Sequence, residues 1–168
     1  FSWGFSIAAS TLVGQRLGAG AETDAEAYGW GILRLSAVVY LIVATVVVAL
    51  GDPIAGIFVD DPANRGLSAQ FVRVAAVSVV AQGVDGSITG ALRGAGDTRV
   101  PFLATLSGLY LVAVPLAWLG TVAPALGIGG LLLALLAETA VPMVVNLRRF
   151  RSNRWKAVSR GYRPSAGD

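Results

Sequence analysis

Long stretches of apolar residues with almost no charge set the strongest limit on how this chain folds. A helix needs about 20 apolar residues, within a range of roughly 17 to 25, to cross the hydrocarbon core of a bilayer. Four stretches reach that length, and a fifth at the start of the chain is at the short limit. Their approximate ranges are 1–17, 28–50, 71–92, 100–119 and 127–147. We therefore predict an all-α fold, a polytopic transmembrane helical bundle over residues 1–150 with about five membrane helices, followed by a basic tail over 151–168.

The composition favours a membrane protein and argues against several other classes. Hydrophobic residues make up 55% of the 168 residues and charged residues 14%, with a mean hydropathy of +0.68, whereas soluble proteins carry about 25% charged residues. A soluble chain with five such stretches would have too little polar surface to cover them. Cysteine and histidine are absent, which removes thiolate sites and the commonest metal ligand and general base. We expect no metal site, no cofactor and no enzymatic activity.

Basic residues are distributed unevenly between the two ends of the predicted bundle. Arg16, Arg93, Arg99 and the tail fall at one end, whereas Arg65 and Arg73 lie near the other. Because cytoplasmic loops carry an excess of lysine and arginine, we expect a multi-pass protein of the cell (plasma) membrane with its tail in the cytoplasm. The tail directly follows a membrane helix, so we expect it to contact membrane lipid and no nucleic acid.

The connecting segments contain residues that begin and end helices, and some aromatic residues lie near the helix ends. Glycine and proline at 18–20, 51–53 and 94–96 end three of the helices. The segment 54–59 is too short to span a membrane and predicts an interfacial half-turn. We expect Trp118 and Trp155 to anchor helix ends at the membrane interface.

The first residues predict that the chain is a fragment of a longer protein or a truncated gene product. Phe1 begins directly within an apolar stretch, without a basic leader, and Met143 is the only methionine. In the orientation expected above, Phe1 lies on the outer side of the membrane, which indicates further helices upstream.

Polar residues lie on a single face of the predicted helix over 71–92. At about 100° per residue, four of them share one side: Ser78, Gln82, Asp85 and Thr89. A charge near the centre of a bilayer costs at least ~2.5–3.5 kcal/mol, so it normally faces a bundle interior or a wet cavity. Glu138 lies near the middle of the last helix, with Pro142 and Asn146 following at four-residue steps. We predict that the four residues and Glu138 bind a substrate or ion; the alternative is that Asp85 and Glu138 only hold helices together.

Glycines at 86, 90 and 94 form an adjoining face of the same predicted helix. In a water-exposed helix each would cost roughly 1 kcal/mol relative to alanine, but in lipid small residues four apart let another helix approach closely. We expect a neighbouring helix to contact this face. Pro115 and Pro142 lie within apolar helices and predict kinks, which serve either as hinges or only as packing geometry.

Three motifs resemble those of the multidrug and toxic compound extrusion (MATE) transporter family. They are LRGAGDTRVP over 92–101, VGQRLGAG over 13–20 and RFRSNRWK over 149–156. The resemblance extends over nearly the whole chain, to about residue 158. It implies a two-lobe transporter of twelve helices, in which this chain is a partial C-terminal lobe that matches helices eight to twelve.

The resemblance also implies a function, partners and a coupling ion. It implies a secondary active antiporter that exports organic cations or amphipathic drugs in exchange for sodium or protons. Its partners would be membrane lipid, an amphipathic or cationic small molecule and the missing N-terminal lobe. The acidic residue of sodium-coupled members falls closer to Gln82, whereas Asp85 lies about one turn later. Two alternatives remain open: a lipid-linked sugar flippase of related architecture, and a truncated membrane scaffold that does not transport.

Overall fold

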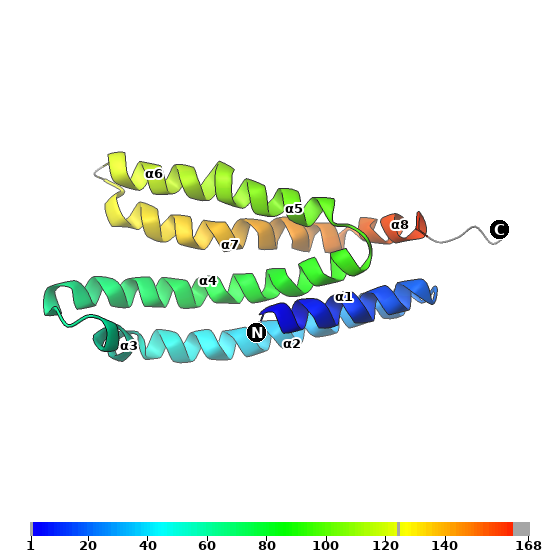
Figure 1. The fold of residues 1–168 in the computed structure, drawn as a ribbon, viewed down its shortest axis with the longest axis horizontal. Helices are drawn as coiled ribbons and strands as arrows, with labels where there is room; N and C mark the ends of the chain where they lie inside the picture. The colour runs from blue at the N-terminus through cyan, green and yellow to red at the C-terminus, as the bar shows by residue number, and fades with distance from the viewer. Residues whose placement is uncertain (1, 124, 163–168) are drawn as a thin grey trace.

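The computed structural model describes residues 2–123 and 125–162, and within these ranges it consists of helices joined by short turns, without a β-strand. The predicted all-α helical bundle is confirmed. Phe1, Pro124 and residues 163–168, which include the end of the predicted tail, lie outside the described residues. The long helices run nearly parallel or antiparallel to one long axis (Figure 1). Their bounds are α1 (Ser2–Gly18), α2 (Glu22–Ala49), α3 (Gly51–Phe58), α4 (Pro62–Gly94), α5 (Arg99–Leu106), η1 (Ser107–Ala113), α6 (Val114–Val122), α7 (Gly127–Arg151) and α8 (Arg154–Arg160).

Within the described ranges, four helical segments are long and apolar enough to cross a membrane: Glu22–Ala49, Pro62–Gly94, Arg99–Val122 and Gly127–Arg151. Helix α1 has 17 residues, at the lower limit for a span of about 17. The ends of α1 and α4 and the start of α5 lie at the same end of the bundle as α8 (Figure 1), which we call the α8 end. The connectors that the distribution of arginines assigns to one end of the bundle therefore do lie at one end.

Two helices begin earlier than their hydropathy indicates, at 22 instead of 28 and at 62 instead of 71. The start of α4 is fixed by Asp61, whose side chain accepts a hydrogen bond from the backbone N–H of Ala63 at 3.0 Å, while Pro62 fills the first position. Both features favour a helix start whether or not the first turns are apolar. Hydropathy finds the part of a helix suited to lipid, not its polar first turns.

The predicted interfacial half-turn over 54–59 is wrong, because α3 is a helix of 8 residues that begins at Gly51. The Asp52 carboxylate forms an ion pair with Arg73 of α4. The same guanidinium reaches the carbonyl oxygen of Val48 at 3.5 Å. Because Arg73 binds both sides of the α2–α3 junction, the turn after α2 is held against α4.

The segment before Pro115 contains a π-helix, η1, between α5 and α6. Proline has no N–H to donate and its ring crowds the preceding turn, and π-helical turns are a known way in which a helix accommodates an irregularity. Gly108 of η1 packs against Pro142 of α7, where an added Cβ would lie 2.8 Å from Cδ of the proline ring. The π-helical segment thus lies against Pro142, which is inside the continuous helix α7.

The glycine face of α4 packs against α1, as the four-residue spacing predicts for a close helix contact. A Cβ on Gly90 would clash with the carbonyl oxygen of Ser6, and one on Gly94 with that of Ser10. From the other side, a Cβ on Gly14 would lie 3.1 Å from the carbonyl oxygen of Gly94. Only helices without side chains at these positions can approach so closely.

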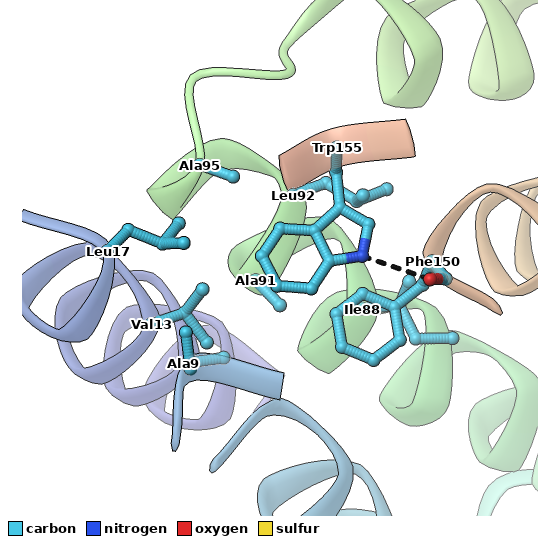
Figure 2. Packing of buried hydrophobic residues seen from close by; sticks show 10 residues of the cluster. Ala9, Val13, Leu17, Ile88, Ala91, Leu92, Ala95, Phe150 and Trp155 are labelled. Atoms are coloured by element: carbon cyan, nitrogen blue, oxygen red, sulfur yellow. Dashed lines mark hydrogen bonds between the residues drawn. The ribbon is translucent and has the colours of Figure 1, made fainter. Parts of the chain in front are cut away.

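A buried apolar cluster joins the helices at the α8 end (Figure 2). Trp155 of α8 is fully buried, its ring stacks on Phe150 with centroids 5.1 Å apart, and its indole N–H donates to the Phe150 carbonyl at 2.9 Å. The prediction that Trp155 anchors a helix end in the membrane interface is therefore wrong. Trp118 on α6, in contrast, is 62% exposed.

Two ion pairs tie α8 to the start of α2. Lys156 pairs with Glu26, and Arg160 binds both carboxylate oxygens of Glu22 at 2.9 and 2.7 Å. The hydrogen bond and the charge of Glu22 raise the pKa of Arg160 above its usual value. Residues 154–160 of the predicted tail thus form a helix that packs on the bundle.

Replacing Gly90 with leucine is predicted to lower the free energy of unfolding by about 1–3 kcal/mol, the range for overpacked sites, because the new side chain collides with the backbone of α1. Unfolding of the detergent-solubilised chain by increasing sodium dodecyl sulfate, followed by circular dichroism, measures the change. Gly66→Leu is the matched control, since Gly66 has open space around its Cα. Equal effects of the two substitutions would contradict the tight contact.

Trp155→Ala is predicted to lower the free energy of unfolding by about 3–5 kcal/mol, the range for buried aromatic truncations. Trp118→Ala is the control; it removes an exposed ring and should change the value by less than about 1 kcal/mol. The same unfolding measurement compares them. A smaller loss for Trp155 than for Trp118 would mean that Trp155 is an interfacial anchor after all.

Candidate functional site

The polar face of α4 lines a cleft of about 630 Å³ that lies between α4, α1 and α5. Gln82, Asp85 and Thr89 contribute to it; Gln82 is exposed and the other two are half-buried. The structure therefore brings together three of the five residues predicted to bind a substrate or ion. The helical spacing accounts for this, because steps of three and four residues keep side chains on one face.

Helix α1 supplies the opposite wall of this cleft, which we call the Asp85 cleft. Ser6 and Ser10 are half-buried, while Trp3 is 82% and Ile7 60% exposed. Because α1 lies directly on the glycine face of α4, the aromatic ring and the carboxylate belong to the same cleft. An aromatic wall and an anionic group suit a ligand that is both apolar and cationic.

Asp85 is held in place by Asn146 of α7, which is fully buried. The Asn146 side-chain amide donates to Oδ1 of Asp85 at 2.8 Å and to Oγ1 of Thr89 at 3.2 Å. Its own Oδ1 atom is buried without a hydrogen-bond partner among the described residues. These two hydrogen bonds orient the Asp85 carboxylate and link α4 to α7 beside the cleft.

Glu138 shares a second, smaller cavity with the cleft residues. This cavity of about 160 Å³ lies between α4, α7 and the α5–η1 segment, and Gln82, Asp85, Thr105 and Glu138 are among the residues that line it. Since Gln82, Asp85 and Thr105 line both cavities, the smaller cavity adjoins the Asp85 cleft, and Asp85 and Glu138 both line it. Glu138 itself is exposed in the described chain.

Ser78 lies outside both cavities, although it falls on the predicted polar side of α4. It is 5% exposed, and its hydroxyl lies 3.0 Å from the Val74 carbonyl oxygen and 3.3 Å from that of Leu135 on α7. At Ser78, two turns before Asp85, α7 packs against the polar face of α4. Further along α4, at Asp85, α1 leaves this face open. Ser78 and Asp85 therefore both contact α7, but only Asp85 also lines the cleft.

Several residues of the site are not among those predicted. The sequence places Asn146 on the same face as Glu138 without giving it a role, although a lone amide in an apolar helix signals a polar partner on another helix. Arg93 lines the cleft one turn beyond Thr89, and its four-residue spacing from Thr89 is the signal that could have found it. The contribution of α1 has no such signal, because it depends on which helix packs on the glycine face.

No group of three or more His, Cys, Asp or Glu side chains within residues 2–123 and 125–162 is arranged to hold a metal ion. The charged groups that line the Asp85 cleft are Asp85 and Arg93, both from α4, while α1 contributes only neutral side chains to it. The arrangement can therefore bind an organic or monovalent cation through a single carboxylate and neutral oxygens.

Comparison with known proteins gives consistent matches. Residues 1–119 match the family model described as MatE. The chain is 35% identical to a "Probable multidrug resistance protein NorM" of Deinococcus radiodurans over 152 residues, which are 88% of this chain and 34% of that protein. It is 32% identical to the protein of the same description from Burkholderia pseudomallei over 95% of this chain and 34% of that protein. No solved structure matches.

A human relative is also similar, the "Multidrug and toxin extrusion protein 1" of Homo sapiens, with 29% identity over 91% of this chain and 27% of that protein. The chain thus spans between 27% and 34% of the length of these curated relatives. Together with the four membrane-capable helices, these matches identify a multi-pass membrane protein.

Asn146→Leu is predicted to lower the free energy of unfolding by about 1–3 kcal/mol, the cost of leaving a buried polar group unpaired. The carboxylate of Asp85 would lose its donor, so the effect should be smaller in an Asp85→Asn background. Unfolding titrations of the two single variants and the double variant give this coupling. Strictly additive effects would show that the Asn146–Asp85 bond contributes no stability.

Proposed function

We propose that this chain, which belongs to the MatE family as its sequence motifs predict, forms part of a secondary active antiporter. The antiporter would export organic cations or amphipathic drugs in exchange for sodium or protons. The observation that carries the proposal is the Asp85 cleft, where a carboxylate lies opposite the exposed ring of Trp3. The relatives' names, which refer to multidrug resistance and toxin extrusion, support drug export over sugar-lipid transfer.

Asp85 would hold the positive charge of the substrate, and Trp3 and Ile7 would cover its apolar part. The carboxylate already accepts a hydrogen bond from Asn146, so it is oriented before a ligand arrives. The aromatic wall adds cation–π attraction and apolar contact area without fixing the shape of the ligand. Such a site tolerates different drugs as long as they carry a cation beside a ring system.

The coupling ion would compete for the same carboxylate. Sodium or a proton neutralises Asp85 and so removes the charge that attracts an organic cation, which makes occupation by ion and drug mutually exclusive. Glu138 would provide a second acidic group near Asp85, since both line the smaller cavity. Exchange follows when the site opens to the two sides of the membrane in turn. The protein would change between these two states only when an ion or a drug occupies the carboxylate.

We also propose a location, an orientation and a partner for the chain. The chain would lie in the plasma membrane with α8 and the basic tail in the cytoplasm, where Arg148, Arg151 and Arg154 would contact anionic lipid. It would correspond to helices eight to twelve of a twelve-helix transporter, with an N-terminal lobe as its partner. Gln82 and Thr89 would contribute neutral oxygen atoms beside Asp85, and no cofactor would be needed.

Binding of tritiated tetraphenylphosphonium, a lipophilic cation, to the purified chain in a neutral detergent tests the role of Asp85. Asp85→Asn is predicted to weaken binding at least about tenfold, the loss expected for one charge-assisted contact. Sodium, or a lower pH at constant sodium, should weaken binding to the wild-type chain and have little effect on the variant.

Asp60→Asn is the matched control, because Asp60 is exposed and lies in the turn before α4. It should leave both the affinity and the ion dependence unchanged. If Asp85→Asn binds the probe as tightly as the wild-type chain, with the same response to sodium and pH, Asp85 is not the cation site and the proposal is wrong.

A further inference from the structure

An apolar groove that shares no residue with the Asp85 cleft runs along one face of α2. It has a volume of about 310 Å³, and its lining residues follow one another at helical steps: Ala27, Tyr28, Gly31, Ile32 and Leu35. All of these except Ile32 are exposed in the described chain, and the Cα of Gly31 has open space around it. We call this surface the α2 groove. It is open to whatever surrounds the bundle.

The α2 groove begins where the acidic first turns of α2 give way to apolar residues. Glu22, Asp24 and Glu26 precede it, and Arg34 is the only charged residue in the stretch that follows, over 28–49. At about 1.5 Å per residue this stretch is roughly 33 Å long, close to the roughly 30 Å of a hydrocarbon core. Tyr28 therefore lies at the level where lipid headgroups meet acyl chains, and the rest of the groove lies beside the acyl chains.

A guanidinium is held at the headgroup end of the groove. Arg16, near the end of α1, donates a hydrogen bond to the Tyr28 hydroxyl at 3.3 Å, and its Cζ atom lies 5.1 Å from the centroid of the tyrosine ring. A guanidinium has five N–H donors, and in the part of the chain that the structure describes Arg16 forms no ion pair. Other arginines at the α8 end also lack an acidic partner, so what matters for Arg16 is its fixed place beside a residue that lines the groove.

Arg34 brings a second positive charge to the same groove from within the apolar part of α2. It is exposed and lies three residues after Gly31, so the two are neighbours on the helix surface. Because side chains in a helix lean toward its N-terminus, the long Arg34 side chain extends back toward the level of Tyr28. Within residues 2–123 and 125–162 it forms no ion pair. A charge at this depth is costly, which indicates that an anionic group from outside the chain reaches it.

We propose that the α2 groove binds one anionic phospholipid, with its phosphate between Arg16 and Arg34 and an acyl chain along the groove over Gly31. A guanidinium binds a phosphate through two parallel N–H donors, which gives direction as well as charge. Asp24, exposed and one turn before Tyr28, adds one negative charge to the same face. Together with the two arginines it leaves a single positive charge, which complements a lipid with a single negative charge. The site does not depend on the proposed role of Asp85.

A second copy of this chain is the other occupant that would fit an apolar groove in a membrane. Ala27 and Gly31 are small residues four apart, and such pairs let helices approach closely in lipid. In a two-fold dimer, however, the same surface of each copy meets the other. The two Arg34 side chains would then face each other at a depth where unpaired charge is costly. An anionic lipid neutralises this charge, so the lipid is favoured.

Native mass spectrometry of the purified chain in a neutral detergent, titrated with lipid, tests the proposal by giving the dissociation constant of the first bound lipid. The two probes have the same dioleoyl chains: phosphatidylglycerol carries one negative charge, and phosphatidylcholine has no net charge. The wild-type chain is predicted to bind phosphatidylglycerol about tenfold more tightly, the difference expected for one charge-assisted contact. Arg16→Gln and Arg34→Gln should each remove most of this preference and leave phosphatidylcholine binding within about twofold.

Arg99→Gln is the matched control for charge, because Arg99 is an exposed arginine at the α8 end that lies outside the α2 groove. It should leave the preference for phosphatidylglycerol unchanged. Gly31→Leu tests the groove itself, since its side chain enters open space and fills the place of the acyl chain. It should weaken both lipids by similar factors. Gly129→Leu, at a glycine of α7 that also has open space, should weaken neither, and circular dichroism verifies that each variant keeps its helices.

Equal affinities of the wild-type chain for the two lipids overturn the proposal. So do equal effects of Arg16→Gln and Arg99→Gln, which would mean a diffuse attraction to the basic end of the bundle. If Gly31→Leu weakens neither lipid, no acyl chain lies in the groove and the proposal fails. A wild-type dimer that Gly31→Leu abolishes would assign the groove to a second copy instead. Asp85→Asn should leave both lipid affinities unchanged, so a failure of the cation site and a failure of the lipid site are told apart.

Discussion

The site depends on a close backbone contact between two helices. Gly90 and Gly94 of α4 have no side chains, so the backbone of α1 lies directly against them at Ser6 and Ser10. This contact aligns α1 with the polar face of α4 and brings the ring of Trp3 opposite Asp85. In lipid, where apolar burial between helices gives little driving force, such backbone proximity is a main source of helix association. The same residues that would weaken a helix in water thus assemble the cleft.

A single buried side chain of α7, Asn146, holds the polar face of α4 by donating to Asp85 and Thr89. Asn146 fixes Asp85 from one side of α4 while α1 leaves the other side open, so the carboxylate is both oriented and accessible. At the α8 end, Trp155 and Phe150 form a buried cluster with α1 and α4 (Figure 2). The apolar cluster and the Asp85 cleft share no lining residue.

The periodicity of the sequence predicts which residues share one face of a helix, but not which helix packs against that face. The face that carries Gln82, Asp85 and Thr89, and the adjoining glycine face, both follow from the angle between successive residues in a helix. Which helix covers each face depends on packing between segments far apart in the chain. Ser78 and Asp85 share a predicted side and both contact α7, yet only Asp85 lines the cleft. Trp155 resembles an interfacial anchor in the sequence because it lies near a helix end, whereas its burial depends on α1 and α4.

The central claim is that a cation binds beside Asp85 between α1 and α4. A crystal structure with tetraphenylarsonium, whose arsenic atom can be located by anomalous scattering, tests this most directly. If the cation binds there, one arsenic peak is expected in the Asp85 cleft, beside the carboxylate and facing Trp3. A peak instead in the apolar groove of about 660 Å³ that Leu103, Tyr110 and Val145 help to line, where no acidic side chain contributes, would contradict it.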